Sequence, residues 1–266
     1  MPEAGPRRTG WLVFRLSVLE LWRNPLGLVL LVVIPAVFIG MIWWTASQDS
    51  IPLKIFFGGE TVQVLLTQRQ VGLVFVSAAV SGFLAAYYAL ILFHNDFGYF
   101  RFCAFMGLRP ALFTVARFAA FLGVTALLAA LTTIGLGRVT PLEQPSMVLA
   151  GFLLITVIYG AYGGIVGVLG RSFMPALLWI VLLAQLDAGW LQNPVYYSAA
   201  QESRVIHGLP AFYPCQMVFS AAFTARDNGA ALGGALAWAM VTVAILILAV
   251  QWRMRGPLGA GGRFDQ

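Results

Sequence analysis

The residues that could carry out chemistry in this chain are few, and most lie at the ends of apolar runs. The 266 residues include 10 acidic side chains, 16 basic ones, two histidines and two cysteines. Asp96 and Asp187 fall at opposite ends of the expected membrane spans, too far apart to share a proton or a metal ion. With only His94 and His207, a histidine-based metal centre is not expected either. We therefore predict neither a catalytic centre nor a metal site.

Nucleotide hydrolysis is not expected in this chain. It would need a phosphate-binding loop in which a glycine–lysine pair opens a helix, but the one lysine, Lys54, follows Leu53. The sequence also lacks the Gly-x-Ser-x-Gly and His-Glu-x-x-His motifs of hydrolases and metalloproteases. Any energy source for this protein would therefore be external to the chain.

The densest group of charged and aromatic residues is His94–Arg117, which reads HNDFGYFRFCAFMGLRPALFTVAR and lies between two apolar runs. A short helix with aromatic anchors and charged edges is suited to insert into a groove of another protein. The alternative is an interfacial loop whose aromatic rings anchor at headgroup depth. The residues expected to make a protein contact are Asp96, Phe97, Gly98, Phe100, Arg101, Gly107 and Arg109.

The elements that must position these residues are membrane helices. The chain is 60% hydrophobic and 10% charged, with a mean hydropathy of +0.86, whereas soluble domains are about 25% charged. We predict an all-α integral membrane protein with one domain over 1–266: a tail and interfacial helix in 1–25, a bundle in 26–251 and a tail in 252–266. The six expected spans are Leu26–Trp44, Val71–Phe93, Ala111–Leu136, Met147–Leu169, Phe173–Trp190 and Ala230–Gln251.

An amphipathic helix is expected before the first span. Trp11–Trp22 is interrupted by Arg15 and Glu20 and followed by Arg23, which favours a helix that lies in the membrane interface; the alternative is the start of the first span. Asn24 and Pro25 predict that a new helix begins there.

The distribution of charge predicts the orientation. Eleven of the 16 basic residues fall on the side of the N-terminus, which places both termini in the cytosol. The same clustering explains the net charge of +6 without nucleic acid as a partner. Arg117 is close enough to the cytosolic end of its span to snorkel toward water.

On the outer side, Thr45–Gln70 is expected to be a polar loop with, at most, a short surface helix. Leu191–Gly229 is expected to dip into the outer leaflet as broken helices, which requires that protein bury their backbone. Asp187 lies near the outer end of its span, where contact with water is the simpler interpretation and a functional role is the alternative.

Small residues recur at four-residue intervals in the fourth span, as Gly160/Gly164 and Gly163/Gly167. This pattern lets a neighbouring helix approach closely. The neighbour can belong to the same subunit or to a second one, and the sequence leaves both open.

These features together resemble the membrane subunit of type 2 ABC transporters, over nearly the whole chain. Leu21–Pro25 (LWRNP) resembles the family's entry to the first span, and His94–Arg117 resembles its coupling segment, although His94–Asn95 replaces the usual acidic pair. The tight turn at Gly170–Ser172 after a glycine-rich span and the Leu209–Pro214 segment (LPAFYP) are also similar.

The resemblance implies a permease subunit of an ATP-driven exporter in a bacterial plasma membrane. Its partners would be a cytosolic ABC ATPase, which would bind ATP and Mg²⁺, and a second permease subunit, identical or related. Arg15, Glu20 and Arg23 would belong to the interfacial helix at this contact. An amphipathic drug-like or lipid-like cargo would move outward past Ser77, Ser81, Tyr87 and Gln185. An ATP-independent channel or secondary carrier, a lipid-modifying enzyme and a non-transporting sensor are the alternatives.

Overall fold

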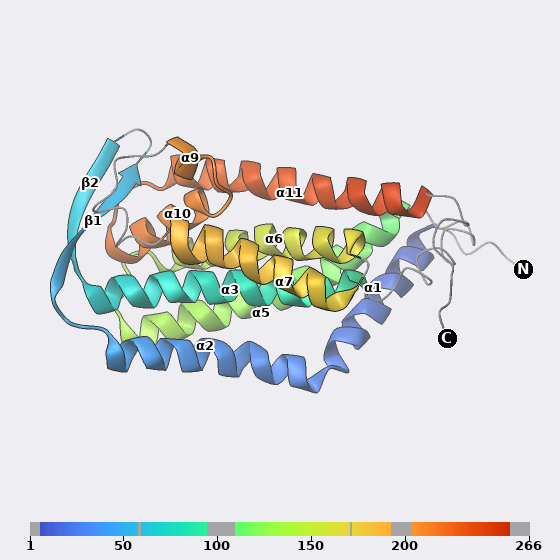
Figure 1. The fold of residues 1–266 in the computed structure, drawn as a ribbon, viewed down its shortest axis with the longest axis horizontal. Coiled ribbons are helices and arrows are strands. Elements are labelled where there is room, and N and C mark those ends of the chain that lie inside the picture. Colours follow the sequence, from blue (N-terminus) through green and yellow to red (C-terminus); the bar gives the residue numbers. More distant parts are fainter. Residues whose placement is uncertain (1–5, 58–59, 95–109, 171, 193–203, 256–266) are drawn as a thin grey trace, which may run out of the picture.

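The computed structural model describes residues 6–57, 60–94, 110–170, 172–192 and 204–255. It is a bundle of helices with a two-stranded sheet at one end (Figure 1). The elements are α1 (Pro6–Trp22), α2 (Pro25–Thr45), β1 (Ser50–Phe57), β2 (Glu60–Thr67), α3 (Gln68–His94), α5 (Pro110–Val139), α6 (Pro145–Leu169), α7 (Phe173–Ala184), the π-helix η1 (Gln185–Leu191), α9 (Arg204–His207), α10 (Phe212–Phe223) and α11 (Gly229–Arg255).

Within these ranges, five helices are long and apolar enough to cross a membrane: α2, α3, α5, α6 and α11. They coincide with five of the six predicted spans, and the structure is that of a multi-pass membrane protein. The other predicted span, Phe173–Trp190, is a shorter apolar helix over Phe173–Ala188. Its α-helical part has only 12 residues and continues into η1. The prediction of six full-length spans is therefore confirmed for five.

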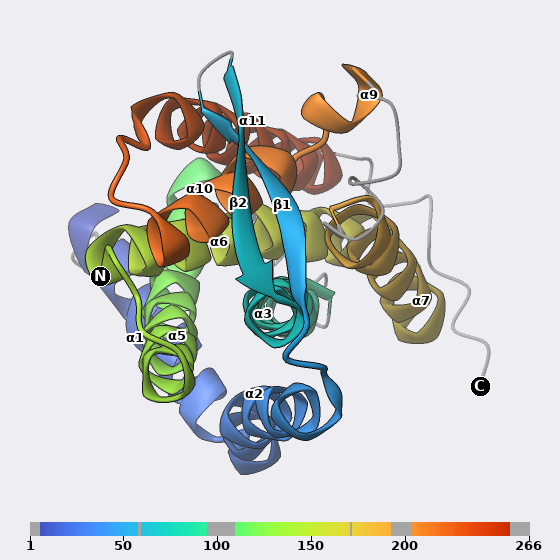
Figure 2. The ribbon, with the colours of Figure 1, turned by 90° about the vertical axis from the view of Figure 1, so that its left-hand side faces the viewer.

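The bundle is built around α3. Viewed along the bundle, α3 lies at the centre, with α2, α5, α6 and α7 around it (Figure 2). Of the most apolar part of each helix, 67% is buried in α3, against 17% in α2 and 28% in α11. Since α2 and α11 are equally apolar but little covered by the chain itself, their outer faces must meet lipid or another protein.

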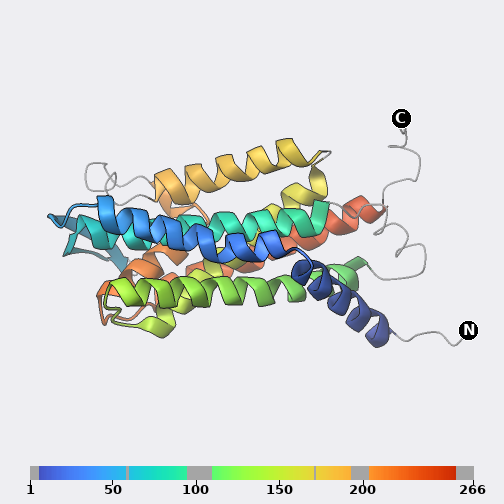
Figure 3. The ribbon, with the colours of Figure 1, turned by 90° about the horizontal axis from the view of Figure 1, so that it is seen from below.

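The two ends of the bundle differ in character. We call one the α1 end: α1, the end of α3, the start of α5, the turn between α6 and α7 and the end of α11 lie there (Figures 1 and 3). We call the other the hairpin end, where β1, β2, α9 and α10 lie. This arrangement matches the predicted alternation of the spans.

The prediction of an all-α fold is wrong at Thr45–Gln70, where the described residues between α2 and α3 form a β-hairpin and no surface helix. Strands β1 and β2 pair antiparallel, with Leu53 opposite Val64 and Ile55 opposite Val62. Leu53 and Ile55 are buried, while Leu65 on the other face is exposed. This alternation is the period of two that a half-buried strand requires, and it puts an apolar face against the end of the bundle.

The segment between the last two spans contains two short helices, α9 and α10, with residues 193–203 outside the described part. Helix α10 is packed among α6, α11 and α3, and Pro214, Met217 and Val218 are buried. At its end, Gln144 Nε2 donates to the carbonyl oxygens of Thr224 and Arg226, each at 2.9 Å. Neighbouring elements of the protein therefore cover α10, as a broken helix inside the membrane would require, and its entry into the outer leaflet stays a prediction.

Candidate functional site

The two flanks of the predicted docking segment, the end of α3 at His94 and the start of α5 at Pro110, lie at the α1 end, while its central residues fall outside the described part of the chain. This holds for Asp96, Phe97, Gly98, Phe100, Arg101, Gly107 and Arg109. The structure therefore leaves their contact with an ATPase as a prediction. What it does show is how the helices on either side of the segment are held.

The end of α3, just before the segment, is tied to α6 and α7. His94 Nδ1 lies 3.3 Å from the carbonyl oxygen of Gly167, and its ring packs edge-on against Phe173 with centroids 5.7 Å apart. A displacement of α3 at this end would therefore also displace the turn between α6 and α7.

The start of α5, just after the segment, is tied to α1. Arg117 Nη2 donates to Glu20 Oε2 at 2.8 Å, and the guanidinium lies 5.5 Å from the centre of the Phe113 ring. Arg117 is 2% exposed, whereas 43% of the Glu20 side chain is exposed. The expected snorkelling of Arg117 toward water is therefore wrong, because α1 lies over this side chain and supplies its counter-charge.

Helix α1 is held on α5 by a narrow apolar face as well as by this ion pair. Val13, Ser17 and Leu21, each four residues apart, are buried. A Cβ on Gly10 would lie 3.2 Å from Leu112 Cδ1, so the helices are in close contact there. Leu12, Leu16, Leu19 and Arg15 of α1 are exposed, as is Arg23 just after the helix.

A sharp bend separates α1 from α2 (Figure 3). Asn24 caps α2, since its Oδ1 accepts a hydrogen bond from the Gly27 amide at 3.0 Å, and Pro25 stands at the first helical position. The prediction of a new helix at Asn24 is confirmed. Because α1 diverges from α2 and exposes apolar residues, its geometry favours a helix in the membrane interface over an extension of the first span.

The glycines of α6 contact other helices of the same chain. A Cβ on Gly163 would collide with the carbonyl oxygen of Ala86 in α3, and one on Gly160 would collide with the ring of Phe121 in α5. A Cβ on Gly164 would lie 2.9 Å from Leu246 in α11, and one on Gly167 would lie 3.2 Å from the carbonyl oxygen of Leu90 in α3. Of the two open alternatives, packing within the subunit accounts for all four glycines.

The four residues predicted to line a path do not share one surface of this chain. Ser77 and Ser81 are buried in α3, and Ser81 Oγ lies 3.0 Å from Thr132 Oγ1 of α5. Tyr87 is half-buried, and Gln185 is exposed. A path between two subunits would have a second wall, so their role in transport remains a prediction.

A polar cluster that the sequence does not predict lies at the hairpin end. The Asp187 carboxylate accepts hydrogen bonds from the Tyr159 hydroxyl at 2.8 Å, the Gln192 side chain at 3.3 Å and the Ala211 amide at 3.2 Å. Asp187 is half-buried, so simple contact with water is an incomplete description of it. Asp187 thereby joins α6, η1 and the start of α10. The one sequence signal for this cluster is an acidic residue in an otherwise apolar run.

Together these contacts tie the helices on either side of residues 95–109 to α1, α6 and α7. No group of three or more metal-binding side chains occurs in the described ranges. No known family model matches the chain, and no curated protein sequence matches it either.

Proposed function

We propose that this chain is the membrane-spanning permease subunit of an ATP-driven exporter of the type 2 ABC class. A separate cytosolic ATPase would dock on residues 94–110 and on α1, and closure of two such motors on ATP would tilt two permease subunits against each other. The ATP and Mg²⁺ would be bound by the ATPase.

The observation that carries this proposal is the ion pair between Glu20 and Arg117. It joins the helix that precedes the first span to the helix that follows the proposed docking segment. A push on residues 94–110 would therefore be transmitted both to α5 and to α1. On the other side of the segment, the contact between His94 and Gly167 would transmit the same push to the turn before α7.

A second permease subunit has a surface available to it in α7. This helix stands at the side of the bundle (Figure 2), and Met174, Leu178 and Trp179 are exposed along it. A partner packed there would enclose a path whose other wall is this chain. Because these walls are apolar, we propose an amphipathic drug-like or lipid-like cargo.

Co-purification with an ABC ATPase tests the proposal. We expect the wild type to form a complex and stimulate ATP hydrolysis, and Arg101→Glu or Phe100→Ala to weaken both. Lys54→Ala at the hairpin end is the control, and it should have no effect. Full complex formation and ATPase stimulation in both docking variants would refute the assignment of residues 94–110 as the contact.

An ATP-independent secondary carrier is the second candidate, and Asp187 is the observation that favours it. A half-buried carboxylate joined to three elements could bind and release a proton during transport. Two transport measurements distinguish the ATP-driven exporter from the secondary carrier. One is made in cells depleted of ATP, and the other in cells whose proton gradient is collapsed. We expect transport to stop on ATP depletion; transport that persists there but fails without the gradient would favour the carrier.

A further inference from the structure

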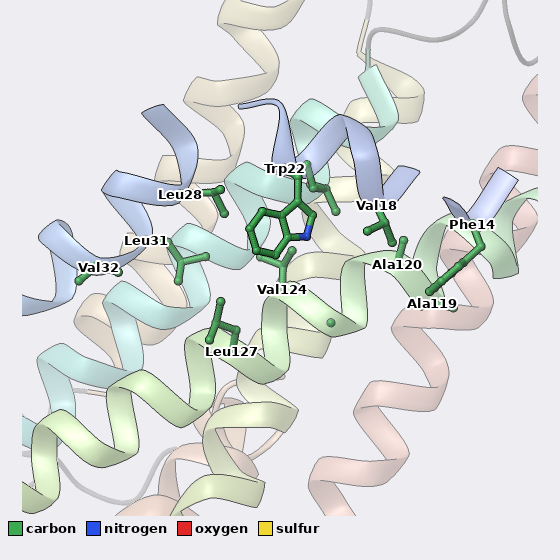
Figure 4. Close-up of a pocket in the computed structure, with 12 residues that line it drawn as sticks. Phe14, Val18, Trp22, Leu28, Leu31, Val32, Ala119, Ala120, Val124 and Leu127 are labelled. Atoms are coloured by element: carbon green, nitrogen blue, oxygen red, sulfur yellow. The ribbon is translucent and has the colours of Figure 1, made fainter. Parts of the chain in front are cut away.

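An apolar groove of about 420 Å³ opens between α1, α2 and α5 (Figure 4). Helix α1 contributes Phe14 and Trp22 to it, α2 contributes Leu31, and α5 contributes Val124 and Leu127. Its volume is within the range of about 300–1,000 Å³ that small-molecule sites occupy. The lining side chains are apolar except for the indole N–H of Trp22, so the groove suits a hydrocarbon and offers little to a polar ligand.

The groove has the depth of one membrane leaflet. Along α5 it extends from Ala119 to Leu127, nine residues whose eight steps rise about 12 Å at about 1.5 Å each. One leaflet contributes about 15 Å, half of a hydrocarbon core of about 30 Å. The groove begins two residues after Arg117, at the α1 end, and runs toward the middle of the bilayer.

Two exposed basic residues are sequence neighbours of groove-lining residues. Arg15 follows Phe14 and Arg23 follows Trp22, and both arginines are exposed. Trp22 itself is 70% exposed, and tryptophan favours the interface between headgroups and hydrocarbon. Arginine side chains at this depth attract the headgroups of anionic lipids.

From depth, lining and charge, we infer that this groove binds one acyl chain of an anionic phospholipid from the leaflet at the α1 end, with its headgroup beside Arg15 and Arg23. The inference requires only that the chain spans a membrane, so it stands apart from the proposed transport function. Because the groove is formed by three helices, a bound chain would also stabilise the joint where α1 lies on α5.

Gly123 provides a way to fill the groove without disturbing the fold. It lines the groove, and a Cβ placed on it would meet no atom within 4 Å. Gly40 on α2 also has nothing within 4 Å but does not line the groove. Gly123→Leu and Gly40→Leu are therefore a matched pair.

The test compares the purified protein in micelles supplied with phosphatidylglycerol or with phosphatidylcholine. Native mass spectrometry measures how much lipid is retained, and the midpoint of thermal unfolding measures stabilisation. We expect the wild type and Gly40→Leu to retain phosphatidylglycerol preferentially and to be stabilised by it. Gly123→Leu should fold, as its own unfolding transition will show, but lose most of both effects.

The headgroup contact is tested separately. Arg15→Gln and Arg23→Gln should each lower the preference for phosphatidylglycerol over phosphatidylcholine about fivefold. Lipid with brominated acyl chains should quench Trp22, measured as the fluorescence difference between wild type and Trp22→Phe, and should not do so in Gly123→Leu. Equal retention of the two lipids by the wild type, or undiminished retention and quenching in Gly123→Leu, would overturn the inference.

Discussion

Arg117 and Glu20 are 97 residues apart in the chain, yet the guanidinium of one donates to the carboxylate of the other at 2.8 Å. The pair is asymmetric, since Arg117 is enclosed and Glu20 is partly open. Removal of the carboxylate would take the Glu20 partner away from a buried positive charge, and this is the costly way to break such a pair. The joint between α1 and α5 therefore depends on Glu20 more than the exposure of that residue suggests.

Glu20→Gln should lower the free energy of unfolding by about 1–2 kcal/mol. Removal of one partner from a fully buried ion pair costs roughly 3–5 kcal/mol. The effect here should be smaller, because water and headgroups reach the Glu20 carboxylate. Denaturant-induced unfolding in micelles measures it.

A double-mutant cycle provides the control for this prediction. Once Arg117→Leu has removed the buried charge, Glu20→Gln should change stability by less than about 0.5 kcal/mol. Equal effects of Glu20→Gln in both backgrounds would show that the ion pair contributes nothing to the joint.

The contact between α3 and α6 depends on the absence of a side chain at Gly163. Gly163→Ala places its Cβ against the backbone oxygen of Ala86, which cannot rotate away as a side chain can. We expect a loss of about 1–3 kcal/mol or more, seen as a lower midpoint of thermal unfolding.

Gly40→Ala is the matched control, because nothing lies within 4 Å of its Cβ. There the lower entropy of the unfolded chain should raise stability by about 0.5–1 kcal/mol. A Gly163→Ala variant as stable as Gly40→Ala would mean that α3 and α6 are further apart than the structure shows.

The long elements of this fold follow from the sequence because apolar length is a direct signal. Five spans and the start of α2 at its Asn24 cap are predictable in this way. The hairpin is harder, because its apolar residues lie within a mixed segment, although Ile51, Leu53 and Ile55 alternate before Gly58–Gly59. A glycine pair between two alternating runs is a hairpin signal. The polar residues around the glycine pair make this signal weak, so the segment is predicted as a loop.

The polar contacts are not predictable from sequence, because each joins residues far apart in the chain. Glu20 and Arg117 stand on separate helices, and the pattern of each helix indicates only which face is apolar. Asp187 likewise signals its importance as an acid in an apolar run. One partner of Asp187 is Tyr159, 28 residues earlier in the chain. The contact between them depends on how α6 and η1 pack, which the sequence does not indicate.

The hydroxyl of Tyr159 should stabilise the docking of α10. Tyr159→Phe removes one of the three donors to Asp187, and the lost hydrogen bond should cost about 1–2 kcal/mol. Hydrogen exchange over Phe212–Phe223 should become faster, since the same carboxylate oxygen accepts from the Ala211 amide at the start of that helix.

Tyr162→Phe tests whether this effect is specific. The ring of Tyr162 is 6.0 Å from that of Tyr159, centroid to centroid, but its hydroxyl is not among the donors to Asp187. The same acceleration of exchange in both variants would attribute it to a general loosening of α6 and not to the hydrogen bond.

The orientation of the bundle can be measured with single cysteines. Cys215 is buried and can be replaced by alanine, which leaves Cys103 in the proposed docking segment as the one thiol. In intact cells a membrane-impermeant maleimide should not label Cys103, and it should do so once the membrane is opened. Adding Leu65→Cys to a variant without Cys103 places a thiol on the hairpin, where residue 65 is 73% exposed, and this thiol should be labelled in intact cells.

Position 65 comes just before α3 and Cys103 follows it in the sequence, so the labelling patterns of the two thiols should be opposite if α3 crosses the bilayer once. Labelling of Cys103 from outside, with protection of the cysteine at position 65, would invert the bundle and place residues 94–110 where no cytosolic ATPase can reach them. The positive residues near the α1 end make that inversion unfavourable, because basic residues close to span ends remain on the cytosolic side. The protected thiol should therefore be Cys103.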